Sequence, residues 1–407
     1  MIKNLKFLPV LLGALLLIVG CASETAAPTA PVIAKGTLTP HADAFMATIG
    51  DTSSTKYYVY TPPGYTAPRP GVSGYPVIYF LNGFGGNENY FVALFSATDA
   101  ADLLLAEGKI EPMVLVFLSG HTVLGGSFYT NSGHPTVGNS EDHIGTVMAA
   151  VEGAYHVDVA KRGVAGHSMG GYGSFSYAMN HPGTFKTIAA MSAPLSFWGT
   201  RTSPPHDVMT YKGIEEVLPT VLRETGYDSI LAQTGGAGSA AAYHQMFYPS
   251  PARRVTSMMF SMAAALSPTT APGATTIDSV VVGFDGSGNP IKSAMYVDLP
   301  LGVDGQIDMP TWNRWMAKDV IARFAGGQAA ALAGVKIYLD CGNADDLGLY
   351  GAHGVLAKVL VEAGMPPSVH TVYPGISDGA GGTTLADHTK QIFERVKSVL
   401  IWESAQF

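Results

Sequence analysis

The stretch Gly163-Val-Ala-Gly-His-Ser-Met-Gly-Gly-Tyr-Gly173 is typical of a strand, a sharp turn and a helix packed beneath the turn. Ser168 stands at the centre of the turn, between Gly166 and Gly170. Glycines suit a turn too tight for side chains, and the helix that follows points its amino end at Ser168. We interpret Ser168 as a catalytic nucleophile. The alternative is a serine that only caps a helix, because a chain with 48 glycines can contain Gly-x-Ser-x-Gly by chance.

Apolar segments of strand length alternate with helical segments along most of the 407 residues. Strands are expected at 57–60, 75–81, 113–118, 162–165, 187–191, 335–340 and 369–373, and helices at 90–107, 141–156, 170–180, 352–363 and 389–402. Buried strands that alternate with helices predict an α/β fold, with a mostly parallel sheet covered by helices on both faces.

This alternation is interrupted between residues 192 and 334. We interpret 195–333 as a long insertion that caps the carboxyl edge of the sheet, with a hairpin at Phe284-Asp-Gly-Ser-Gly-Asn-Pro290. A separate second domain is less favoured, because the interval has no complete strand–helix set of its own. The whole catalytic domain is therefore assigned to residues 51–407.

The first 20 residues predict export, because a basic start precedes an apolar run too short for a confident membrane span. The run ends in Leu17-Ile-Val-Gly-Cys21, which resembles a bacterial lipobox. We therefore expect residues 1–20 to be a lipoprotein-type signal peptide and Cys21 to be lipidated. An ordinary signal peptide that contains a cysteine is the alternative.

Residues 21–50 are predicted to tether the anchor to the globular domain, because the stretch up to about Thr37 is rich in Ala, Pro and Thr. Ala22 after the cysteine suggests sorting to the outer membrane. The expected location is therefore outside the cytoplasm, with the chain lipid-anchored in a bacterial outer membrane or in the periplasm. Several acyl chains on one N-terminus would make membrane attachment stable.

Composition excludes several classes of partner. The net charge is −8 and no basic run is present, so we expect no nucleic-acid partner. Without Cys21 only Cys341 remains, which excludes a disulfide framework. The sequence has no His-Glu-x-x-His, no paired-cysteine motif and no Gly-x-Gly-x-x-Gly after a strand, so no metal or cofactor is predicted. It does not indicate an oligomeric state.

A serine nucleophile needs a histidine base and a carboxylate that orients the histidine. In a parallel sheet these groups converge only from loops after the carboxyl ends of strands, and the expected chain order is Ser, Asp, His. Asp345 follows the strand at 335–340, and His388 lies between the last strand and the terminal helix. We predict that Ser168, Asp345 and His388 form a triad.

Other acidic and histidine side chains are weaker candidates. Asp340 is expected to lie within its strand, whereas Asp346 is left open as an alternative acid. His370 falls in a strand and His353 opens a helix, so both are expected to be structural. His167 is expected to shape the turn beside Ser168 rather than to take its proton.

The oxyanion needs two backbone N–H donors. We assign them to Met169, at the nucleophile turn, and to Phe84, in the loop that follows the strand at 75–81. Gly85-Gly86 could instead form an ordinary turn or a phosphate loop. The phosphate loop is not favoured, because no Gly-Lys-Ser/Thr follows.

From about Thr52 onward the chain resembles the esterase D, feruloyl esterase and mycolyltransferase group of α/β-hydrolases. The matching segments are Tyr75-Pro-Val-Ile-Tyr-Phe-Leu-Asn-Gly-Phe-Gly-Gly86, Ser127-Phe-Tyr-Thr-Asn-Ser132, Glu141-Asp142, Gly166-His-Ser-Met-Gly-Gly171 and Tyr338-Leu-Asp-Cys-Gly-Asn-Ala-Asp345. The resemblance implies the same triad and oxyanion residues. Two departures are Asn82-Gly83, where the family commonly has His-Gly, and the five residues that separate Gly381-Gly382 from His388.

The expected function is that of a serine esterase with an acyl-enzyme intermediate, acting on an extracellular or envelope ester of feruloyl, acetyl or acyl type. The alcohol is expected to be a small molecule or part of a polysaccharide. Acyl transfer of the mycolyltransferase type and a non-catalytic lipid-anchored binding protein are the alternatives. Aromatic side chains could line an acyl or aryl pocket, although core packing is favoured for each: Phe128, Tyr129, Trp198, Phe247 and Tyr248.

Overall fold

The computed structural model describes residues 33–50, 56–197, 254–269, 276–277, 280–284, 290–293, 297–298, 300, 308–343, 345, 349–373, 388 and 392–407. The chain divides into two units, 1–33 and 34–407, and the fold below is that of the second. The predicted signal peptide, Cys21, Trp198, Phe247, Tyr248 and Asp346 lie outside the described residues. Within the described ranges, no helix combines the length and the apolar character that crossing a membrane requires.

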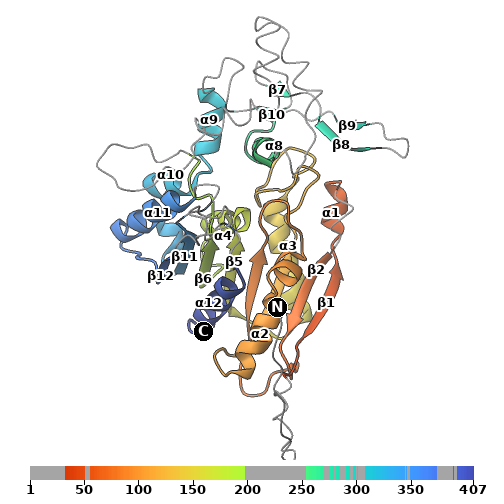
Figure 1. Cartoon of the computed structure of the whole chain (residues 1–407), viewed down its shortest axis with the longest axis vertical. Helices are drawn as coiled ribbons and strands as arrows, with labels where there is room; N and C mark the ends of the chain where they lie inside the picture. Colours follow the sequence, from red (N-terminus) through yellow and green to blue (C-terminus); the bar gives the residue numbers. More distant parts are fainter. Residues whose placement is uncertain are drawn as a thin grey trace, which may run out of the picture. The chain divides into compact units, whose positions relative to one another are not determined.

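The core of the second unit is one sheet of eight strands in the order β1-β2-β4-β3-β5-β6-β11-β12. Figure 1 shows β1 and β2 on one side of the sheet and β11 and β12 on the other. The strands are β1 Thr37–Ala42, β2 Lys56–Thr61, β3 Tyr75–Leu81, β4 Val114–Leu118, β5 Val157–His167, β6 Thr187–Met191, β11 Lys336–Gly342 and β12 Val369–Tyr373. Only the β1–β2 and β2–β4 pairs are antiparallel, and the other neighbours run parallel. The predicted mostly parallel α/β sheet is confirmed.

Helices cover both faces of the sheet, because its central strands are apolar on both. In β3, Ile78 and Phe80 pack into one hydrophobic cluster, to which α2 (Ala97–Ala106) and α12 (Ile392–Ser404) contribute. Val77, Tyr79 and Leu81 pack into the other cluster, with α3 (Ser140–Ala154), α4 (Met169–Asn180) and α11 (Tyr350–Glu362). Burying each such side chain contributes roughly 1.5–3 kcal/mol.

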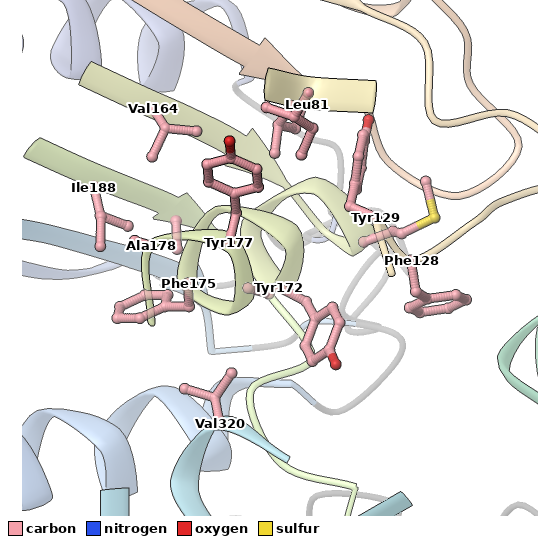
Figure 2. Packing of buried hydrophobic residues seen from close by; sticks show 14 of the residues in the cluster. Leu81, Phe128, Tyr129, Val164, Tyr172, Phe175, Tyr177, Ala178, Ile188 and Val320 are labelled. Carbon is pink, nitrogen blue, oxygen red and sulfur yellow. The ribbon is translucent and has the colours of Figure 1, made fainter. Parts of the chain in front are cut away.

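Helix α4 lies against the strands on either side of the nucleophile turn. Figure 2 shows Tyr177 and Ala178 of α4 facing Val164 of β5 and Ile188 of β6. The exposed fraction of all four side chains is 5% or less. This packing fixes the direction in which α4 leaves the turn at Ser168.

Two differences from the predicted elements lie in the amino-terminal third of the chain. Residues assigned to the tether form β1 and the short helix α1 (Ala44–Thr48), so the globular unit begins before residue 51. β1 is an edge strand, where Pro40 removes no hydrogen bond from the sheet interior. The helix predicted at 90–107 is divided into the π-helix η1 (Tyr90–Leu94) and α2, because Ser96 has φ +51°.

The interval between β6 and β11 contributes none of its described strands to the large sheet. It contains α8 (Arg254–Leu266), α9 (Met309–Met316), α10 (Val320–Ala325), the 3-10 helix η3 (Gln328–Leu332) and two strand pairs, β7 (Thr276–Ile277) with β10 (Val297–Asp298) and β8 (Val280–Phe284) with β9 (Pro290–Ser293). The antiparallel β8–β9 pair confirms the predicted hairpin, whose turn lies outside the described residues.

Helix α8 contacts the loop that follows β4, at the carboxyl edge of the sheet. Ser132 Oγ in this loop donates a hydrogen bond to Ala264 O at 2.5 Å, and Ser261 Oγ donates to Gly126 O. Part of the insertion therefore lies at the edge where the predicted catalytic loops begin.

Candidate active site

Ser168 joins the end of β5 to the start of α4 in a strained conformation. Its φ is +55° and its ψ −121°, which a residue with a side chain rarely adopts. Such strain costs about 1–3 kcal/mol and persists only where the surroundings enforce it. The Ser168 N–H donates to Met191 O at 2.8 Å, and this bond ties the turn to β6.

The glycines of the turn are required by close backbone contacts. A Cβ on Gly170 would lie 1.8 Å from Leu81 O, and a Cβ on Gly166 would lie 2.1 Å from the carbonyl carbon of Gly170. Neither distance is possible for a real side chain. Glycine at 170 therefore lets the turn lie against the end of β3, and glycine at 166 lets α4 start close to β5.

Asp345 and His388 form a buried pair. His388 Nδ1 lies 2.7 Å from Asp345 Oδ2, and the two residues are 3% and 8% exposed. An ionised carboxylate only accepts hydrogen bonds, so Nδ1 is the donor and Nε2 is left with its lone pair. This is the tautomer that a general base needs.

Backbone and side-chain donors hold Asp345 in place. Its N–H donates to Gly342 O at 3.2 Å, and its Oδ1 accepts from the Leu349 N–H at 3.5 Å. Cys341 Sγ lies 3.7 Å from Oδ2, the same oxygen that His388 contacts. Burial, together with the Asp345 charge, raises the pKa of the Cys341 thiol well above its ordinary value. The thiol therefore remains protonated and can donate to this carboxylate.

His388 lies next to the nucleophile turn. Its ring centroid is 4.7 Å from that of His167, the residue that precedes Ser168. Ser168 Oγ makes no hydrogen bond to His388 in the part of the chain that the structure describes. Catalytic hydrogen bonds are often long in a free site and shorten when substrate binds. The structure thus brings Asp345 and His388 together and places Ser168 on the adjoining turn.

The rival residues have other partners. Asp340 lies in β11 and is fully buried, and Arg395 Nε donates to its Oδ1 at 3.0 Å. His353 Nε2 accepts from the Ala193 N–H at 2.7 Å, and burial lowers its pKa to about 3. His370 lies in β12, where burial also lowers its pKa. These positions leave Asp345 and His388 as the described pair suited to serve Ser168.

The two backbone donors predicted for the oxyanion lie on different elements, Phe84 in the loop after β3 and Met169 at the start of α4. Neither the Phe84 N–H nor the Met169 N–H donates to an acceptor among the described residues. Their side chains pack on neighbouring glycines, since a Cβ on Gly125 would lie 2.6 Å from the Phe84 ring and one on Gly126 2.4 Å from Met169 Sδ. The Gly85 N–H donates to Gly125 O at 2.8 Å and fixes this arrangement.

The side chain of Asn82 holds the same loop in place through hydrogen bonds, a role that the sequence did not reveal. Its Nδ2 donates to Gly83 O at 2.8 Å and to Gly86 O at 2.7 Å. Its Oδ1 accepts from the Gly120 N–H and from Tyr129 Oη, each at 2.8 Å. The buried amide satisfies all four partners, which an imidazole at this position could not do. Its place two residues before Phe84, the predicted oxyanion residue, is the signal that could have indicated this role.

The predicted aromatic pocket residues that the structure describes are core residues. Phe128 and Tyr129 are each 1% exposed. Figure 2 shows Phe128 near Tyr172 of α4, and the two ring centroids are 6.1 Å apart. Core packing, the role favoured for them, is confirmed.

The chain is similar to known proteins both in sequence and in fold. Residues 52–214 match the family described as putative esterase. A ferulic acid esterase is similar in structure with a TM-score of 0.51 and 16% identity, covering 93% of this chain and 100% of the other. This likeness shows the α/β-hydrolase fold.

Two further solved structures are similar over much of their length. One is FphF, a fluorophosphonate-binding serine hydrolase of Staphylococcus aureus, with 15% identity, coverage of 91% and 99% and a TM-score of 0.47. The other is an S-formylglutathione hydrolase from Agrobacterium tumefaciens, with 12% identity, coverage of 92% and 97% and a TM-score of 0.47.

Proposed function

We propose that this chain, whose residues 52–214 match the putative esterase family, is a carboxylic ester hydrolase of the serine hydrolase kind that acts through a Ser168–His388–Asp345 triad. The observation that carries the proposal is the buried 2.7 Å contact between Asp345 and His388, beside the strained turn of Ser168. Sequence order alone left the choice of acid open between Asp345 and Asp346.

The first half of the reaction acylates the serine. His388 Nε2 takes the proton of Ser168 Oγ while Oγ bonds to the ester carbonyl carbon. The carbonyl oxygen becomes an oxyanion, and the N–H groups of Phe84 and Met169 stabilise it. His388 then gives its proton to the leaving alcohol as the C–O bond breaks.

The second half releases the acid. His388 takes a proton from water, the resulting hydroxide adds to the acyl carbon, and His388 returns the proton to Ser168 Oγ as the acyl–serine bond breaks. Asp345 accepts from His388 Nδ1 throughout and stabilises the imidazolium that forms twice in each cycle. The Ser168 proton leaves with the alcohol and a proton from water replaces it, so the free enzyme is regenerated without a cofactor.

We further propose that the substrate is an ester outside the cytoplasm, of feruloyl, acetyl or acyl type, on a small molecule or a polysaccharide. The support is the predicted export signal with Cys21 as lipid anchor, together with the fold shared with a ferulic acid esterase. Aryl esters are therefore the first substrates to test, followed by acetylated sugars and longer acyl esters.

The experiment is hydrolysis of short p-nitrophenyl esters by the wild-type chain and by Ser168→Ala. The variant is expected to lose turnover by several orders of magnitude. Circular dichroism and the unfolding midpoint of both proteins serve as the fold control. Unchanged turnover in Ser168→Ala would show that the nucleophile lies elsewhere.

A further inference from the structure

The backbone carbonyl of His388 is held by two buried side chains from distant parts of the chain. His167 Nε2 lies 2.6 Å from His388 O, and Arg395 Nη1 donates to the same oxygen at 3.2 Å. His167 is 0% exposed and Arg395 is 1% exposed. The position of His388 thus depends on groups outside the triad.

Tyr90 fixes the tautomer of His167. Tyr90 Oη lies 2.7 Å from His167 Nδ1. A carbonyl oxygen only accepts, so His167 must carry its proton on Nε2 to bond His388 O, and Nδ1 must then accept from the Tyr90 hydroxyl. With the other tautomer, the lone pair of Nε2 would face the carbonyl oxygen and repel it.

The ring of Tyr90 also fills the space beneath the loop that carries Phe84. A Cβ on Gly86 would lie 2.3 Å from the Tyr90 ring, and a Cβ on Gly83 would lie 2.5 Å from Tyr90 Oη. One side chain therefore contacts both the predicted oxyanion loop and the histidine that holds His388.

We infer that Tyr90 and His167 are a positioning pair. Tyr90 determines which ring nitrogen of His167 carries the proton, and His167 holds the backbone of His388 in place relative to the loop that carries Phe84. Neither side chain exchanges a proton with the substrate. The inference rests on the proposed role of His388 as the base, and it deepens that role by naming what sets its place.

The test compares four variants with the wild type in hydrolysis of p-nitrophenyl acetate. Tyr90→Phe keeps the ring under the loop and removes the hydroxyl. His167→Gln keeps an N–H donor near the position of Nε2 and has no tautomer to be set, whereas His167→Leu removes the donor. The double variant Tyr90→Phe/His167→Gln completes a mutant cycle.

The expected result is a loss of kcat without a matching change in KM. Tyr90→Phe and His167→Leu should each lower kcat roughly tenfold to hundredfold, since misplacing a reacting group by about 1 Å has effects of that size. His167→Gln should retain more activity than His167→Leu. In the His167→Gln background, Tyr90→Phe should have no further effect, because no tautomer remains to be selected.

The matched control is Tyr60→Phe, which removes a buried hydroxyl that lies 2.7 Å from Asp102 Oδ1 in another part of the sheet. It should leave kcat unchanged, and the unfolding midpoint is measured for each protein. If His167→Leu does not fold, Tyr90→Phe and the cycle still decide the question.

Wild-type kcat in Tyr90→Phe overturns the inference, as does an equal loss from Tyr90→Phe in the His167→Gln background. Ser168→Ala, measured in the same assay, separates this failure from that of the triad. If Ser168→Ala is inactive while Tyr90→Phe is unaffected, only the positioning pair is wrong. If Ser168→Ala stays active, the proposed function itself is wrong.

Discussion

His388 Nδ1 and Asp345 Oδ2 lie 2.7 Å apart although the two residues are separated by 43 positions in the chain. The contact selects one tautomer of the imidazole and leaves Nε2 able to take a proton. It also gives the carboxylate a role that an uncharged isostere would not fulfil.

Replacing Asp345 by Asn should therefore lower kcat by about 10³–10⁴-fold, because an amide can donate to Nδ1 and stabilise the wrong tautomer. KM should change far less. The measurement is steady-state hydrolysis of p-nitrophenyl acetate, with Asp346→Asn as the matched control. If Asp346→Asn is the more damaging change, the acid has been assigned to the wrong residue.

Asn82 offers a test of the oxyanion loop that does not alter Phe84 itself. Asn82→Asp keeps the acceptor oxygen for Gly120 and Tyr129 but removes both donors to Gly83 O and Gly86 O. Loosening an oxyanion donor should reduce kcat by roughly tenfold to hundredfold, with a smaller effect on KM. A variant with full kcat would show that the loop holds its shape without this amide.

Gly170 tests the close contact beneath the nucleophile turn. Gly170→Ala places a Cβ 1.8 Å from Leu81 O, so β3 and α4 must separate. We expect a loss of several kcal/mol in the free energy of unfolding, or no soluble protein. The control is Gly153→Ala in α3, where a Cβ meets nothing within 4 Å and alanine favours the helix. Similar stability of the two variants would contradict the contact.

Glu403 gives the fold a pH dependence that is separate from catalysis. It lies in α12, is 0% exposed, and burial raises its pKa to about 8. In an unfolded chain a glutamate has a pKa of about 4.3, so between these values the folded state binds a proton that the unfolded state has lost. The contribution of Glu403 to stability therefore decreases as pH rises from about 4.3 to about 8.

Glu403→Gln removes this titration while keeping the size of the side chain. Relative to the wild type, the variant should gain stability with rising pH, by at most about 1.4 kcal/mol for each pH unit in that window. Urea unfolding at several pH values between 5 and 8 measures the difference. A difference that stays constant with pH would show that Glu403 does not titrate in this range.

The sequence predicted the elements that are buried on both faces or follow a continuous helical pattern. The run at 75–81 became β3 with every residue buried, and the segment after Ser168 became α4. It did not reveal β1, because Pro40 and the partly exposed residues of that edge strand lack a buried-strand pattern. The division at Ser96 was also missed, since a positive φ at a serine has no signal in composition.

For the site, the order of loops along the chain predicted which residues could meet, but not how they are held. Asp340 was expected to belong to its strand, and the structure confirms this and gives Arg395 as its partner. The contact of His167 with His388 O joins residues 221 positions apart, and no local pattern indicates it. The three triad roles themselves stay predictions.

The most direct test of the account is the site of covalent labelling by a fluorophosphonate probe, mapped by mass spectrometry of the digested chain. An activated serine reacts with such a probe, whereas an ordinary serine does not. The account predicts one modified peptide, carrying the label on Ser168, and no labelling of Ser168→Ala. A label on another residue, or a wild-type chain that stays unmodified, would contradict it.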